Sequence, residues 1–192
     1  GSESGKIKQI CKNLSIQEVE IRTRKSQDVK EYLQELEFEK KIIQFPSEFE
    51  EMKHVLNKLF NQYTEELRKR NMLFGPASKT NLIKLQKSII LSLSRGNKNW
   101  NYLLGVSACA SAVKIQHALE LLETQTLESF HKYLKKLFTK EKNKKSKGVM
   151  KLVAKPEFNY VYMQSNELLI KKREHPKLEE LSNLVQKEQE KN

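Results

Sequence analysis

Apolar residues recur every three to four positions through most of the chain, which is the period of an amphipathic α-helix. The clearest case is the stretch 98–125, the longest run with few charges. Small residues crowd its first half, where they would let neighbouring helices approach closely, and larger residues follow. We therefore expect this stretch to be the central, buried helix of a helical domain. The side chains expected to face inward are Leu103, Val106, Ala110, Val113, Ala118, Leu121 and Leu122.

The same period predicts helices on both sides of this central one. Their ends follow from capping and breaking residues: a capping box of Ser47 and Glu50, N-caps at Thr80 and Thr126, and a stop at Gly96. We expect helices over 47–70, 80–95, 126–139, 149–154, 157–172 and from Pro176 onward. In the last of them, the residues expected to face inward are Leu178, Leu181, Leu184 and Val185.

The first 46 residues have a mixed pattern. Residues 1–5 are expected to be a cloning remnant and a disordered tail. An amphipathic helix is predicted over 6–14, a short strand over 19–21, and a second extended segment over 36–42. The residues of this first helix expected to face inward are Ile7, Ile10, Cys11 and Leu14. This part has an αβ character, but it holds too few elements to form a core of its own.

Composition agrees with a helical protein. The chain has 192 residues, and it contains only 6 glycines and 4 prolines, which favours helices over a β-rich fold. The formal net charge is +12. A lysine-rich solvated surface would explain this charge, and so would a polyanionic partner, of which nucleic acid is the commonest.

The sequence offers no catalytic or metal-binding constellation. It has no glycine-rich phosphate loop, no GxSxG and no HExxH, and Cys11 and Cys109 lack the Cys or His neighbours of a zinc site. We therefore assign no catalytic residue, metal ligand or bound cofactor. We expect His117 to be structural and hydrogen-bonded at a helix junction; as a general base it would need an orienting partner, which Glu120 or Glu123 could supply at helical spacing. No membrane partner is expected either, because charged residues interrupt the central apolar run before about 20 apolar residues accumulate.

Lysines are concentrated between positions 132 and 155, where ten of them accompany one acid, Glu141. We expect residues 140–148 to form a mobile loop after the end of a helix, a good arrangement for binding phosphates without reading bases. The candidate nucleic-acid contacts are Lys135, Lys136, Lys140, Lys142, Lys144, Lys145 and Lys147. A secondary basic group consists of Lys84, Lys87, Arg95 and Lys98. The sequence leaves open whether the two groups share a face.

Three segments resemble one helicase family. They are KIQHALELLETQ (114–125), NLSIQEVEIRTRKSQDVKEYLQ (13–34) and HPKL (175–178). Together they are similar to the end of the first RecA-like domain and the thumb-like helical insert of the Hef/Fanconi anaemia group M branch of superfamily 2 helicases. Two positions depart from that pattern: Thr126 stands where the family usually has glycine, and Gln116 where it often has histidine.

The resemblance implies a mainly all-α, elongated helical bundle over 47–192, inserted between two motor domains, and a remnant of the first RecA-like domain over 6–46. The parent would be an ATP- and Mg²⁺-dependent helicase or translocase acting on branched DNA at stalled replication forks, cytoplasmic in archaea or nuclear in eukaryotes. The partners implied are nucleic acid and the flanking motor domains. The chain itself carries none of the family's ATPase motifs, so it is not expected to hydrolyse ATP alone.

Two alternatives stay open at this stage. The insert could chiefly brace the motor domains or recruit a protein partner. It could also belong to a related helicase whose helical insert binds double-stranded RNA.

Overall fold

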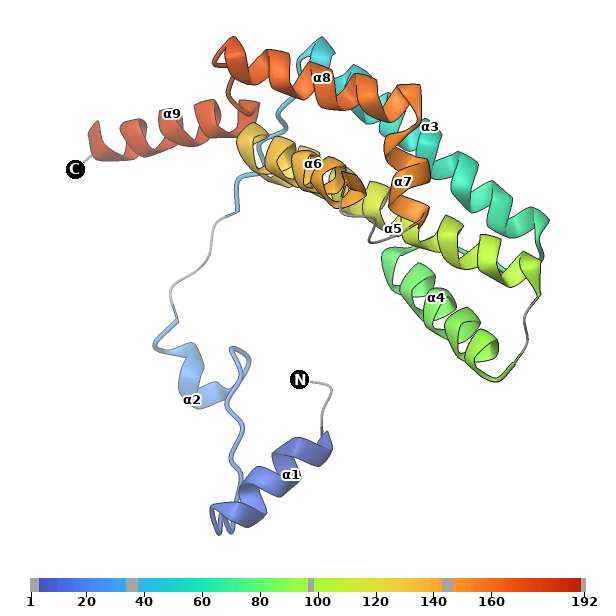
Figure 1. Cartoon of the computed structure of the whole chain (residues 1–192). Helices are drawn as coiled ribbons and strands as arrows, with labels where there is room; N and C mark the ends of the chain where they lie inside the picture. Colours follow the sequence, from blue (N-terminus) through green and yellow to red (C-terminus); the bar gives the residue numbers. More distant parts are fainter. Residues whose placement is uncertain (1–3, 34–37, 97–98, 143–146, 191–192) are drawn as a thin grey trace. The chain divides into compact units, whose positions relative to one another are not determined.

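The structure, a computed structural model, describes residues 4–33, 38–96, 99–142 and 147–190. The chain divides into two compact units, residues 1–41 and residues 42–192, which we describe separately. Within the described ranges all regular structure is helical, which confirms the mainly all-α prediction but not the short strand expected near the N-terminus (Figure 1). The helices of the first unit are α1 (Ser4–Asn13) and α2 (Gln27–Lys30). Those of the second unit are α3 (Ser47–Lys69), α4 (Lys79–Ser94), α5 (Trp100–Thr124), α6 (Leu127–Lys142), α7 (Lys147–Val153), α8 (Pro156–Ile170) and α9 (Pro176–Glu190).

The first unit buries no residue among those described in it. Ile7 and Ile10 of α1 and Leu14, which follows it, are exposed, so their predicted inward orientation is wrong. The strand predicted over 19–21 does not form either, since a strand needs a partner and the described part of this unit supplies none. The helix α1 begins at Ser4, inside the tail that was expected to be disordered. Of the second predicted extended segment, the described residues 38–42 are not in a strand.

The second unit is built around α5, which confirms the central helix. This helix packs against α3, α4, α6 and α7, while α8 covers α3 and α6 (Figure 1). Its buried face carries mostly small residues, including Gly105, Ala108 and Cys109, with larger ones such as Ile115 in its second half. Leu103 is 48% exposed, so its predicted inward position is wrong. Long side chains from the neighbouring helices, for example Phe130, fill the remaining space.

Helix ends depart from the predicted caps where a nearby residue is better placed. Pro46 occupies the N-cap of α3, and the Ser47 hydroxyl donates to the Glu48 carboxylate, so the predicted capping box is not formed. At α4 the cap is Ser78, whose Oγ accepts from the Asn81 N–H at 3.3 Å, instead of Thr80. The predicted Thr126 cap is confirmed, because its Oγ1 accepts from the Ser129 N–H at 3.2 Å.

Two further differences lie in the second half of the chain. The basic segment expected as a loop over 140–148 is partly helical: α6 continues to Lys142 and α7 begins at Lys147, while residues 143–146 lie outside the described ranges. The helix α9 starts at Pro176 as predicted but buries none of its residues. Leu178, Leu181 and Val185 are exposed, so their predicted inward orientation is wrong, while Leu184 is half-buried. No helix in the described ranges is long and apolar enough to span a bilayer.

His175 ties the beginning of the second unit to its end. Its side chain is only 2% exposed, and its ring packs edge-on against Phe45 and Phe49, with centroids 5.5 and 5.8 Å away. Its Nδ1 accepts from the Lys177 N–H, so Nε2 carries the proton and donates to the Leu122 carbonyl at 3.0 Å. The segment entering α3 and the one entering α9 therefore meet at the C-terminal end of α5.

Candidate nucleic-acid interface

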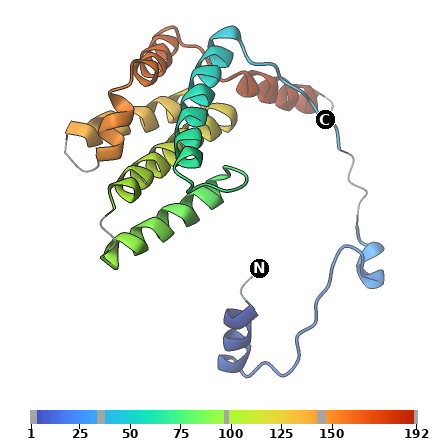
Figure 2. The same ribbon diagram turned by 90° about the vertical axis from the view of Figure 1, so that its right-hand side faces the viewer.

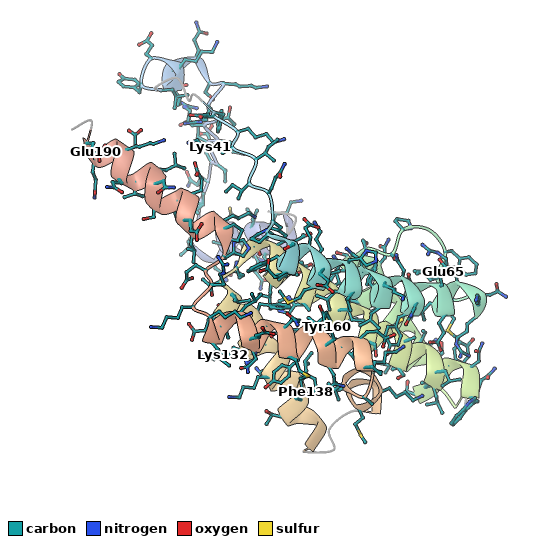
Figure 3. The ribbon with its side chains drawn as sticks, turned by 90° about the horizontal axis from the view of Figure 1, so that it is seen from above. Lys41, Glu65, Lys132, Phe138, Tyr160 and Glu190 are labelled. Carbon is teal, nitrogen blue, oxygen red and sulfur yellow. The ribbon has the colours of Figure 1, made fainter. Side chains whose placement is uncertain are left out.

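The helix α6 has one apolar face and one cationic face. Leu127, Phe130, Leu134 and Leu137 are buried against the neighbouring helices, which fixes the rotation of the helix about its axis. The opposite face is exposed and carries Lys132, Lys135 and Lys136, at helical spacings of three and four residues. Lys132 can be found in Figure 3.

The three lysines of this face, which we call the α6 cationic face, have no carboxylate within ion-pair distance in the described part of the chain. Like charges at helical spacing repel one another, and exposed Glu128, one turn before Lys132, offsets only part of the repulsion among the three lysines. A polyanion that lies along the face would relieve the rest. The face therefore offers phosphates a row of ammonium groups carried by a helix whose orientation is fixed.

The structure describes the predicted contacts to different degrees. Lys135 and Lys136 are exposed on α6, as a binding role needs. Lys140 and Lys142 belong to the last turns of α6, and Lys147 is the first residue of α7, but their side chains lie outside what the structure describes. The remaining two, Lys144 and Lys145, fall in the undescribed segment.

Lys132 belongs to this face but was not among the residues selected from the sequence. It lies inside the lysine-rich segment, and its spacing from Lys135 and Lys136 places all three on one side of a helix. Combining charge with helical position would have identified it.

A set of aromatic contacts holds α6 against α8. The His131 ring stacks on Tyr162 at a centroid distance of 5.0 Å, and its Nδ1 lies 2.9 Å from the Ser165 hydroxyl. Burial lowers the pKa of His131, and the nearby charge of Lys135 lowers it further. His131 is therefore neutral at pH 7 and acts as a packing residue. Phe138, labelled in Figure 3, adds a second contact to Tyr162, with the two ring centroids 4.5 Å apart.

The secondary basic group lies on α4 and just after it. Lys84, Lys87 and Arg95 are at least partly exposed, and Lys98 is outside the described residues. Among the helices that the structure describes, α4 packs only against α5, at the edge of the bundle (Figure 2). Its outer side is therefore open to a ligand.

Several other cations are engaged by carboxylates. Arg70 binds Glu66 at 2.8 Å and the Asn101 side chain at 2.7 Å, which joins the end of α3 to the start of α5. Lys53 pairs with Glu123 at 3.2 Å. A groove of about 970 Å³ follows α3, but its lining combines lysines with Glu65 and Glu66. These surfaces are mixed in charge and suit a polyanion less well than the α6 cationic face.

His117 lies at a junction of helices, the position predicted for it. Its Nδ1 lies 3.3 Å from Glu120 Oε2, and its ring meets Tyr133 edge-on at 4.8 Å. Glu120 also binds Lys79, and this bond is the main reason that the pKa of Glu120 is lowered. The four residues join α4, α5 and α6.

Neither cysteine belongs to a metal site in the described residues, and the thiol of Cys109 is not a reactive one. Cys109 is fully buried, and burial raises the pKa of its thiol to about 11, so it stays protonated and inert. No group of three or more His, Cys, Asp or Glu side chains in the described residues is arranged to hold a metal ion.

The chain is similar in sequence to helicases. Residues 48–174 match the family described as "Putative ATP-dependent RNA helicase, helical bundle". The whole chain is 29% identical to a protein of Methanocaldococcus jannaschii called "Putative ATP-dependent RNA helicase", of which it spans 23% of the length.

The fold matches a solved structure as well. The chain superimposes over its full length on the crystal structure of the Pyrococcus furiosus Hef helicase domain, with a TM-score of 0.74 and 23% sequence identity. It spans 40% of that chain. The match supports the helical architecture described above.

Proposed function

This chain belongs to the helical-bundle family of ATP-dependent RNA helicases, and we propose that it is the insert by which such a helicase grips forked DNA. The observation that carries the proposal is the α6 cationic face, whose three lysines have no carboxylate partner in the described chain. The relatives' names speak of RNA helicases and of the Hef helicase domain. The choice of forked DNA rests on the resemblance of residues 114–125 to the Hef branch.

The proposed mechanism is electrostatic. Ammonium groups on α6 displace the cations condensed around the phosphate backbone, and the release of those cations drives binding. Lysine is a point charge without the planar fork that arginine uses to read guanine, so the contact holds the backbone without selecting a base sequence. Because α6 is anchored by its buried face, the lysines are held as a rigid row while the motor domains would move the strand.

The part of the chain that the structure describes offers no site that fits ATP or Mg²⁺. The sequence has no glycine-rich phosphate loop, and the described residues hold no cluster of metal ligands. We assign both to the motor domains of the parent helicase, and no step proposed for these 192 residues uses them.

Competition binding tests the proposal. A labelled DNA fork is bound to the chain and displaced by unlabelled fork, linear DNA duplex or double-stranded RNA of equal length. We expect the fork to be the strongest competitor, followed by duplex. Preferential displacement by double-stranded RNA would refute the DNA assignment and support the RNA alternative.

A matched pair of variants tests the face itself. Lys135→Ala with Lys136→Ala removes two charges from α6, and Lys58→Ala with Lys69→Ala removes two exposed charges from α3. We expect the α6 pair to weaken fork binding at least tenfold and the α3 pair to weaken it less than threefold. Equal losses would mean that only overall charge matters.

A second function, bracing of the motor domains, is favoured by a different observation. Leu181 and Val185 of α9 are at least half exposed, and α9 packs against no other described helix. An apolar stripe of this kind is typical of a surface that another domain covers. Charged substitutions on α9 should then lower the ATPase rate of the full-length helicase while leaving fork binding by this chain unchanged.

A further inference from the structure

A long part of the second unit contains no acidic residue. From 71 to 119 there are 49 residues without an Asp or Glu, and six of them are Lys or Arg. This stretch forms the loop after α3, all of α4 and most of α5. Lys79, at the first turn of α4, pairs with Glu120, which lies just beyond the stretch. The sequence of α4 and the start of α5 therefore contributes only positive charges to the surface.

Large apolar side chains are exposed along this acid-free stretch, in which Asn101 at the start of α5 also binds the Arg70–Glu66 pair at the end of α3. Trp100, the first residue of α5 and the sole tryptophan of the chain, is 71% exposed. Leu103, one turn later on the same side of the helix, is about half exposed, as are Ile90 and Leu91 near the end of α4. A soluble domain seldom leaves a tryptophan so open unless the ring contacts a ligand or partner.

The face of α5 that bears Trp100 leads directly to the lysine-rich segment. Ser107, two turns after Trp100, lies against the start of α7, where a Cβ added to Gly148 would be 3.2 Å from the Ser107 Oγ. Ser111, one turn further, donates to the Gly148 carbonyl at 3.3 Å. Seven residues of helix correspond to about 10 Å along the axis. The start of α7 therefore meets α5 about two helical turns after Trp100, on the same side of the helix.

We infer that Trp100 is a stacking platform for an unpaired nucleobase, with Leu103 as its apolar border. The inference rests on the proposed nucleic-acid function and adds the part of the substrate that this end of the bundle recognises, a single-stranded segment. An exposed indole ring in a stretch of sequence that carries Lys and Arg but no Asp or Glu matches a strand that presents flat bases and a phosphate backbone. An acidic amphipathic peptide would be the other partner suited to such a surface, and the test below includes it.

The single tryptophan gives a direct assay. The intrinsic fluorescence of the 192-residue chain is followed during titration with (dT)₁₅, with a 15-base-pair duplex and with an acidic amphipathic peptide, while fluorescence anisotropy of labelled ligand reports binding independently. We expect (dT)₁₅ to quench the emission strongly with the same Kd that anisotropy gives. The duplex and the peptide should leave the emission nearly unchanged.

Substitutions separate stacking from charge. Trp100→Ala should weaken (dT)₁₅ binding about 5- to 100-fold. The Kd of Trp100→Phe should stay within about threefold of that of the original chain, because a flat ring remains. Met163→Ala, at an exposed apolar site on α8, should leave the Kd unchanged. Circular dichroism confirms that each variant is folded.

The two proposals fail in different ways. Binding of (dT)₁₅ that leaves the fluorescence unchanged, or that survives Trp100→Ala, overturns the stacking platform and leaves the proposed function standing. Equal quenching by duplex, or quenching only by the peptide, also overturns it. Absence of binding to any nucleic acid overturns both.

Discussion

Removal of the His175 side chain should destabilise the second unit more than any other single histidine substitution. The residue is buried, and it holds the entry to α3, the end of α5 and the start of α9 in one place. His175→Ala deletes both ring hydrogen bonds, to the Leu122 carbonyl and from the Lys177 N–H, and the edge-on contacts with two phenylalanine rings.

The expected loss follows from these contacts. Each neutral hydrogen bond contributes about 1 kcal/mol, and each aromatic contact contributes about 0.5 kcal/mol or more. Together they give a decrease of about 3 kcal/mol in the free energy of unfolding. For a unit of about 150 residues this corresponds to a drop in Tm of roughly 6–12 °C.

Urea and thermal unfolding, monitored by circular dichroism, measure this loss. His54→Ala is the matched control, because His54 is the same residue type in the same unit but is exposed on α3. It should change the free energy of unfolding by less than about 0.5 kcal/mol. A His175→Ala variant that unfolds like the His54→Ala variant would refute the assignment of His175 as the tie between these segments.

The same histidine predicts a pH dependence. Burial lowers the pKa of His175 below its usual value, and the charge of Lys177 lowers it further, while the bond to the Leu122 carbonyl opposes both. The unfolded chain takes up the proton at about pH 6.5, so it binds more protons than the folded chain just below that pH. Stability should therefore fall from about pH 7.5 to about pH 5.5, and the fall should be smaller in His175→Gln.

Three further outcomes follow from burial and packing. Cys109 is buried and Cys11 is partly exposed, so a thiol reagent should modify one cysteine in the native chain and both in urea. Gly148→Ala should lower the free energy of unfolding by about 1–2 kcal/mol, measured by urea titration, since the new methyl group would press on the backbone of Ser107. Leu181→Ser should change it by less than about 0.5 kcal/mol in the same assay, because Leu181 is 56% exposed.

Helical periodicity predicted the bundle well because each of its helices has a local apolar stripe. It identified α5 as the centre, and glycine and threonine marked two helix ends correctly. The same rule failed for α1 and α9, since an apolar stripe shows that a face can be buried but not what buries it. The N-caps of α3 and α4 lie one or two residues before the predicted ones, because several neighbouring residues can cap a helix and the sequence does not show which of them does.

The candidate site was only partly visible in the sequence. Charge clustering selected Lys135 and Lys136, but the orientation that adds Lys132 needs the helix and its buried side. The sequence could not predict that α7 packs on the side of α5 that bears Trp100. This packing depends on a contact between Gly148 of α7 and Ser107 of α5, which are 41 residues apart in the chain. His175 was signalled by the HPKL resemblance, but its role as a tie depends on contacts with segments far away in sequence.

The salt dependence of DNA binding tests the central claim most directly. The slope of log Kobs against log [NaCl] for a duplex becomes shallower by about 0.9 for each phosphate that the protein no longer neutralises. Lys135→Ala with Lys136→Ala should therefore reduce the slope by about 2, and Lys58→Ala with Lys69→Ala should leave it unchanged. Parallel lines for the original chain and the α6 variant would contradict the α6 cationic face as the phosphate-binding surface.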